Sequence, residues 1–168
     1  MRTLVADTSG LVSLGIAGDT DTDPLALCFD VYDVFLPEAV VEELRETAAY
    51  NDAHGDSARL ALERTGDATV RSVTLDARFP LDDGENAAVT LANEIEASLF
   101  LCDEFNRLGL IHASLATTRL VTTPTLLAVF VRSGRLESSD ALELLEEISS
   151  VRNWESNSYV QRARSLFV

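Results

Sequence analysis

Two acidic residues that could take part in catalysis each follow a short apolar segment. Asp7 ends the apolar run at residues 3–6, and Asp103 ends the run at residues 98–102. Continuous apolar runs of this length are typical of strands buried on both faces of a sheet. Because the carboxyl ends of parallel strands meet at one edge, we expect the two aspartates to lie close together.

Two glutamates lie on helices expected at the same edge. Glu43 lies in a helix expected from Glu38 onward, and Glu85 lies in the first turn of an amphipathic helix whose apolar stripe includes Leu91 and Ile95. Clustered carboxylates raise one another's pKa values unless a cation lies between them. Mg²⁺ and Mn²⁺ prefer such oxygen ligands and bind phosphate oxygens. The sequence therefore predicts metal-assisted hydrolysis of a phosphodiester, with four metal-binding catalytic acids: Asp7, Glu43, Glu85 and Asp103.

Each acid also has a purely structural interpretation. Asp7 can cap the helix that follows it, and Glu85 can form a capping box with Asp82. Glu43 can be one of several solvated acids on its helix. Asp103 ends a fully apolar strand, where an unused charge is costly, so this residue favours a functional interpretation.

Other charged residues near these acids leave two roles open. Glu104 is either a fifth metal ligand or a solvated loop acid, and Arg107 either pairs with the acids or contacts a phosphate. His54 and His112 are far in sequence from every candidate acid. We do not expect either histidine to act as a ligand or base.

Strands alternate with helices along the chain. Strands are expected at residues 3–6, 31–36, 70–75, 98–102 and 119–123, the third of them at an edge. Helices are expected from residue 8 or 9 to a glycine at 15 or 18, from residue 38, at 57–64, from residue 82, at 107–115, at 125–131, from a cap at 139–140, and near the C-terminus around 159–166. This alternation predicts an α/β fold, a three-layer α/β/α sandwich with a mostly parallel central sheet. We expect one domain spanning residues 1–168.

The composition bounds the class of protein. Two cysteines, Cys28 and Cys102, lie in apolar surroundings and are expected to be buried free thiols. We expect a soluble, cytoplasmic protein with no membrane partner, because no signal peptide opens the chain and no apolar run is long enough to cross a bilayer.

The charge is strongly acidic. The formal net charge is -15, and all 13 basic residues are arginine. Acids spread over an otherwise globular composition indicate a host with a salt-rich cytoplasm, a halophile, in which screening suppresses self-repulsion. The same negative charge disfavours contacts with the phosphates of a nucleic acid. In concentrated salt this argument is weaker, because salt reduces the contribution of phosphate contacts to binding in any case.

The order of these segments resembles the PIN-domain family, and within it small prokaryotic PIN proteins related to toxin ribonucleases of toxin–antitoxin pairs. The resemblance covers most of the chain. It rests on four fragments in order: Leu4-Val-Ala-Asp7-Thr8-Ser9, Pro37-Glu-Ala-Val40-Val-Glu-Glu43-Leu44, Leu81-Asp-Asp-Gly84-Glu85, and Leu101-Cys-Asp103-Glu104 with Arg107. The second fragment selects Glu43 over Glu42. The chain departs from the family in carrying Thr122-Thr123 where a Gly-Thr pair is usual, and in having few basic residues around the site.

The resemblance implies a divalent-metal site, cleavage of single-stranded RNA, a possible antitoxin partner and a homodimer. An alternative is a PIN-like module that binds RNA or a protein partner without cutting it. A phosphatase of the haloacid type is disfavoured, because it needs an Asp-x-Asp pair at the first strand and Asp7-Thr8-Ser9 lacks the second aspartate.

Overall fold

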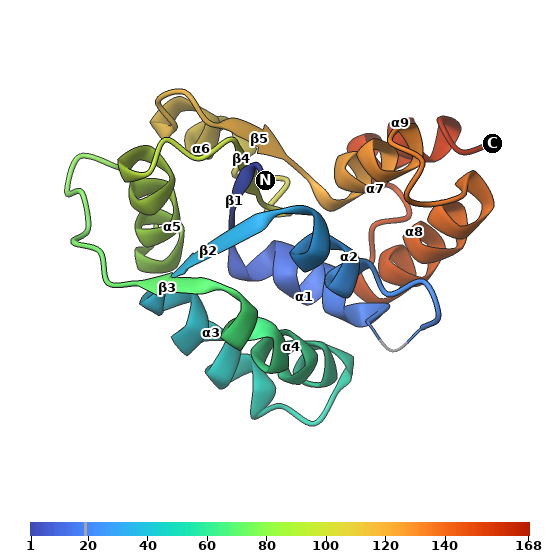
Figure 1. The fold of residues 1–168 in the computed structure, drawn as a ribbon, viewed down its shortest axis with the longest axis horizontal. Coiled ribbons are helices and arrows are strands. Elements are labelled where there is room, and N and C mark those ends of the chain that lie inside the picture. The colour runs from blue at the N-terminus through green and yellow to red at the C-terminus, as the bar shows by residue number, and fades with distance from the viewer. Residues whose placement is uncertain (19) are drawn as a thin grey trace.

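A computed structural model describes residues 1–18 and 20–168, and its centre is a parallel sheet. Its five strands are β1 (Thr3–Ala6), β2 (Asp33–Pro37), β3 (Thr69–Arg71), β4 (Leu99–Leu101) and β5 (Arg119–Val121). They lie in the order β3-β2-β1-β4-β5, and each neighbouring pair is parallel (Figure 1). The expected parallel sheet is confirmed.

Helices fill the connections between the strands. They are α1 (Thr8–Ile16), α2 (Pro24–Val31), α3 (Glu38–Ala48), α4 (Ala53–Arg64), α5 (Asp83–Glu94), α6 (Leu108–Ser114), α7 (Thr123–Arg132), α8 (Ser138–Arg152) and α9 (Ser158–Ser165), with a 3-10 turn at Thr65–Asp67. In Figure 1, α5 and α6 lie on one side of the sheet, whereas α1, α3 and α4 pack together on the other. This is the expected three-layer α/β/α arrangement.

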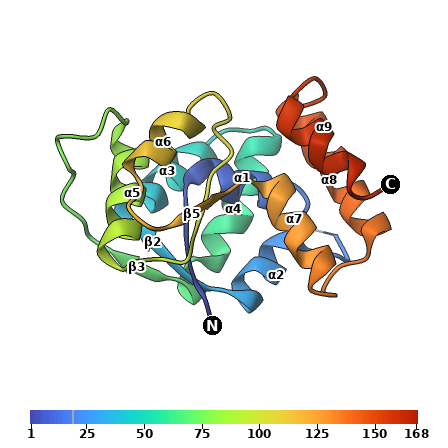
Figure 2. The same ribbon diagram turned by 90° about the horizontal axis from the view of Figure 1, so that it is seen from above.

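The last three helices form a group beside the sheet. Helix α8 packs against α1 and α7, and α9 packs against α7 and α8. Both views place these helices at the end of the molecule farthest from α5 (Figure 2). The group therefore brings residues from the C-terminal third of the chain next to α1, which follows the first strand.

The apolar pattern of the strands determines their place in the sheet. All three residues of β4 are buried, as are Leu4, Val5 and Ala6 of β1, so these central strands are covered on both faces. All three residues of β3 are exposed, as expected of an edge strand. Both cysteines are buried and free, as predicted.

The observed elements differ from the expected ones in a few places. Helix α2 was not expected, and it includes Val31, so β2 begins two residues later at Asp33. Helix α4 begins at Ala53 because Asp52 caps it, its carboxylate accepting the N–H of Gly55 at 2.8 Å. Helix α8 begins at Ser138 without the expected side-chain cap.

The carboxyl edge of the sheet positions the predicted acids. Asp7 directly follows β1, and its N–H donates to the carbonyl of Leu101 at 2.9 Å, which fixes it beside the end of β4. The N–H of Cys102 in turn donates to the carbonyl of Val121 at 3.0 Å. The ends of β1, β4 and β5 therefore lie side by side at one edge.

Among the helices of the described chain, none combines the length and apolarity needed to cross a bilayer.

Candidate active site

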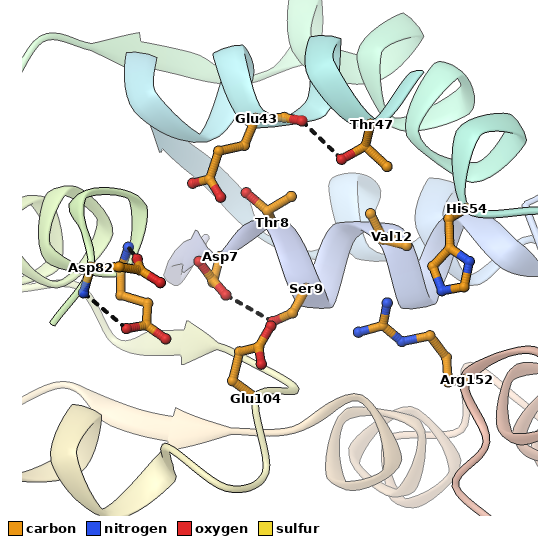
Figure 3. Close-up of a pocket in the computed structure, with 11 residues that line it drawn as sticks. Asp7, Thr8, Ser9, Val12, Glu43, Thr47, His54, Asp82, Glu104 and Arg152 are labelled. Carbon is orange, nitrogen blue, oxygen red and sulfur yellow. Dashed lines mark hydrogen bonds between the residues drawn. The ribbon is translucent and has the colours of Figure 1, made fainter. Parts of the chain in front are cut away.

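A pocket of about 190 Å³ opens at the carboxyl edge of the sheet (Figure 3). Its walls come from α1, α3, α4, α8, the start of α5 and the loop after β4. Five of its lining residues are acidic: Asp7, Glu43, Asp82, Glu85 and Glu104. Figure 3 shows Asp7, Glu43 and Glu104 toward one end of the pocket, with His54 and Arg152 toward the other. The pocket is thus acidic at one end and basic at the other.

Asp7 is buried and held in place through Ser9. The Ser9 hydroxyl donates to Oδ2 of Asp7 at 2.8 Å and accepts the N–H of Asp103 at 3.0 Å. Burial raises the pKa of Asp7 to about 6, and the charges of Glu104 and Glu85 add to this effect while the Ser9 hydrogen bond opposes it. Asp7 occupies the N-cap position of α1 but caps no N–H with its side chain, so the simple capping interpretation does not account for it.

Glu43 faces the same pocket from α3. Its Oε1 is buried and has no hydrogen-bond partner among the described residues, and the same is true of the Thr8 hydroxyl next to it in Figure 3. Gly84 packs so closely against this carboxylate that a side chain there would overlap Oε1. Burial, followed by the charges of Asp7 and Asp82, raises the pKa of Glu43 to about 7. Its carboxylate is therefore poised to take up a proton or a cation.

Glu85 is held at the start of α5 by two sets of contacts. The capping box predicted from the sequence is present: the N–H of Glu85 donates to Asp82 at 2.8 Å, and the N–H of Asp82 donates to Glu85 at 3.2 Å. In addition, Nε of Arg107 donates to both Glu85 carboxylate oxygens, at 2.9 and 2.8 Å. Of the two roles left open for Arg107, the structure shows the ion pair. Glu85 both caps a helix and lines the pocket.

Asp103 and Glu104 face different surroundings. Asp103 is buried, and its carboxylate accepts the N–H of Thr123 at 2.7 Å and the Thr123 hydroxyl at 2.5 Å. It does not line the acidic pocket, whereas the half-buried Glu104 does. Burial raises the pKa of both carboxyls; hydrogen bonds from Thr123 oppose this at Asp103, and the charge of Arg152 opposes it at Glu104.

Two basic lining residues, His54 and Arg152, were not expected at the site from the sequence. His54 lies in the first turn of α4 and Arg152 at the end of α8, so each is far in sequence from the acids. The packing of α8 against α1 brings Arg152 to the pocket. His112, in contrast, is exposed on α6 and outside the pocket.

A hydrated divalent cation fits the acidic end. Mg²⁺ usually keeps several waters and needs only one or two direct carboxylates. Glu43 offers a buried, unpartnered oxygen. Asp7 is buried and Glu104 is half-buried, and both line the same pocket. In the described part of the chain, no three ligand-type side chains are placed so that together they could hold a metal ion. The donor set therefore suits a water-rich ion held by few direct contacts.

A family model described as a PIN domain matches residues 3–167. No curated protein matches the chain in sequence.

Proposed function

Because this chain belongs to the PIN-domain family, we propose that it is an endoribonuclease that uses Mg²⁺ or Mn²⁺ to hydrolyse phosphodiester bonds of single-stranded RNA. The observation that carries the proposal is the pocket itself. It gathers five carboxylates from four parts of the chain, with the pKa values of Asp7 and Glu43 raised to about 6 and about 7. Such a cluster repels a phosphate unless a cation lies between them.

Three pocket acids are the proposed direct or water-mediated ligands: Asp7, Glu43 and Glu104. When bound, a divalent ion lowers the pKa of a coordinated water and neutralises charge that develops on phosphate oxygens. Ser9 orients the Asp7 carboxylate through its 2.8 Å hydrogen bond. Arg107 fixes Glu85 at the pocket wall. These contacts hold the acids in place before substrate arrives, which is the condition for electrostatic catalysis.

The basic end of the pocket is the proposed phosphate-contacting end. Arg152 forms no ion pair with any residue that the structure describes, and it points into the pocket in Figure 3. Its guanidinium can donate to a phosphate oxygen, and His54 lies beside it. A phosphodiester can then lie between the cation and Arg152.

Asp103 has a separate proposed role. Two Thr123 donors engage its carboxylate, so it joins the end of β4 to the start of α7 and thereby aims Glu104 into the pocket. We propose that Asp103 positions the site and that Glu104 faces the cation. The sequence-based prediction of Asp103 as a metal ligand remains the alternative.

A second candidate function is a PIN-like module that binds RNA or a protein without cutting it. One observation favours it: the carboxylates of Glu85 and Asp103 are already engaged by Arg107 and Thr123. Under this alternative these two acids are structural, and the remaining ones do not suffice for catalysis.

Metal titration and RNA cleavage distinguish the two functions. Calorimetry with Mn²⁺ in concentrated KCl should show binding to the wild type and none to Asp7→Asn. The wild type should cleave a labelled single-stranded RNA in Mn²⁺, and chelation should abolish this activity. Glu104→Gln should weaken Mn²⁺ binding at least 10-fold. Asp103→Asn should mainly lower thermal stability and affect Mn²⁺ binding less. Absence of Mn²⁺ binding by the wild type would remove the nuclease proposal.

The toxin role and the homodimer are finer proposals. A small basic or DNA-binding protein encoded beside this chain, and inhibition of RNA cleavage when it is added, would support an antitoxin partner. Light scattering in concentrated KCl should give twice the 18.3 kDa mass of one chain.

A further inference from the structure

A second, larger pocket of about 750 Å³ adjoins the acidic one. Three residues line both: His54, Glu104 and Arg152. The rest of its wall comes from the loop after β4 and from the segment joining α8 to α9. The two pockets therefore share part of their walls at the basic end of the first.

Three aromatic rings form an ordered stack in the wall of this second pocket. Phe105 and Tyr159 are stacked, with ring centroids 5.7 Å apart and planes 10° apart. Trp154 packs edge-on against Phe105 at 5.0 Å. Trp154 is buried at 6% exposure, whereas Tyr159 is 46% exposed. The inner two rings thus support an outer ring that remains open to a ligand.

Local structure fixes the position of Tyr159. It lies at the start of α9, where Asn157 caps the helix by accepting the N–H groups of Tyr159 and Val160 at 2.9 and 3.3 Å. One side of its ring is occupied by Phe105. Little conformational freedom is left to lose when a second flat group stacks on it.

Polar groups suited to a base edge flank the rings. Asn106 and Asn153 are exposed in the same wall, and neither side-chain amide is hydrogen-bonded to a residue that the structure describes. An amide offers both donors and an acceptor, as the edge of a nucleobase does. The Arg152 guanidinium lies 5.8 Å from the centroid of Trp154, at the junction of the two pockets.

We propose that the second pocket binds a nucleobase of the single-stranded RNA, stacked on Tyr159 and near Asn106 and Asn153, next to the phosphate at the acidic pocket. This inference rests on the proposed function for the identity of the strand. RNA fits better than a peptide because the stacked ring and free amides adjoin the pocket at which a phosphodiester would lie. Base stacking on aromatic side chains is a recurrent mode of single-strand binding.

The negative charge of the protein increases the importance of stacking for RNA affinity. With a net charge of -15 and 13 arginines as the only basic side chains apart from two histidines, few phosphate contacts are available. Phosphate contacts also weaken steeply as salt rises. Stacking does not depend on counterion release, so it supplies affinity that survives concentrated salt.

The test compares a fluorescein-labelled RNA hexamer with hexamers that lack one base at a defined position. Fluorescence anisotropy is measured in concentrated KCl with Asp7→Asn protein, which is not expected to cut. Removal of the one critical base should weaken binding about 5- to 150-fold, from the 1–3 kcal/mol that stacking contributes per base. Adding Tyr159→Leu, which retains apolar packing, should cause the same loss and abolish the effect of base removal. Tyr159→Phe should retain the effect, and so should Tyr50→Ala, which alters a 63% exposed tyrosine outside both pockets.

A kinetic readout separates the subsite from the chemistry. In otherwise wild-type protein, Tyr159→Leu should raise KM with little change in kcat. Equal affinity for complete and base-lacking hexamers would overturn the subsite, leave the nuclease proposal standing, and point to a protein partner for this pocket. If the wild type binds no Mn²⁺ and cuts no RNA, the nuclease proposal fails, and base-dependent binding that requires Tyr159 would still support the subsite.

Discussion

Neutralising Asp7 should stabilise the metal-free protein at neutral and alkaline pH, although the same change should abolish metal binding. Asp7 is 5% exposed, and burial raises its pKa from 3.8 to about 6. The folded state therefore holds this proton more tightly than the unfolded chain does. The ionised carboxylate destabilises the fold above the folded-state pKa, and Asn removes that charge while keeping an acceptor for Ser9.

The shift gives the size of the effect. A change of about two pKa units corresponds to about 3 kcal/mol at most, because each unit is about 1.4 kcal/mol. Burial is the largest cause of the shift, and the charges of neighbouring carboxylates add to it, so its parts are not independent of the rest of the site. We therefore expect Asp7→Asn to increase the free energy of unfolding by about 1–3 kcal/mol at pH 8. Well below pH 3.8, the ordinary pKa of this carboxyl, it is protonated in both states and the difference should vanish. It should grow between pH 4 and 7, as the wild type loses stability.

Urea unfolding with a chelator, in concentrated KCl at pH 4 to 8, measures this difference. Asp30→Asn, which alters an exposed carboxylate on α2, is the control and should show no such pH dependence. Mn²⁺ should offset this difference: at 100 times its dissociation constant it adds about 2.7 kcal/mol to the wild type and nothing to the variant. Two results would refute the reasoning. One is a metal-free Asp7→Asn protein that is less stable than the wild type at pH 8. The other is a difference in free energy of unfolding that is as large at pH 4 as at pH 8.

Further substitutions test how the site is built. Gly84→Ala should displace the Glu43 carboxylate, because the added Cβ overlaps Oε1. All the acids are still present in this variant, but its Mn²⁺ affinity in calorimetry should be at least 10-fold lower. Gly109→Ala is the control: its Cβ meets nothing within 4 Å, and Mn²⁺ binding should be unchanged. Ser9→Ala should lower the free energy of unfolding by about 1–3 kcal/mol in urea at pH 5, because the buried N–H of Asp103 loses its acceptor; an unchanged midpoint would contradict this.

The sequence carried enough information to predict the elements at the carboxyl edge. The apolar runs that end at Asp7 and Asp103 are the central strands β1 and β4, and the Asp82 and Glu85 pattern is a capping box. These signals are local, since strand burial and helix capping depend on neighbouring residues. Helix α2 was missed, because a short apolar segment is compatible with either a helix or a buried strand.

The basic end of the pocket could not be predicted from the sequence. His54 and Arg152 themselves are almost a hundred residues apart in the sequence, and no periodicity links them. They meet because α4 and α8 both pack on α1. Tyr159 likewise reaches the second pocket through the packing of α9 on α7 and α8. Such meetings depend on tertiary packing, which composition and spacing do not encode locally.

Asp103 and Glu104 show a subtler limit of the sequence. Both follow a buried strand, so the pattern places both at the correct edge, but it does not determine which side chain faces the pocket. The structure separates them: Thr123 engages Asp103, and Glu104 turns into the cavity. The hydroxyl that engages Asp103 belongs to Thr123, the first residue of α7. Thr123→Val, which keeps the side-chain volume and removes the hydroxyl, should therefore lower the stability of the fold while Mn²⁺ affinity changes less than in Glu104→Gln. The opposite order, with Mn²⁺ affinity lost more completely in Asp103→Asn than in Glu104→Gln, would assign the metal to Asp103 and make its contact with Thr123 a feature of the metal-free state alone.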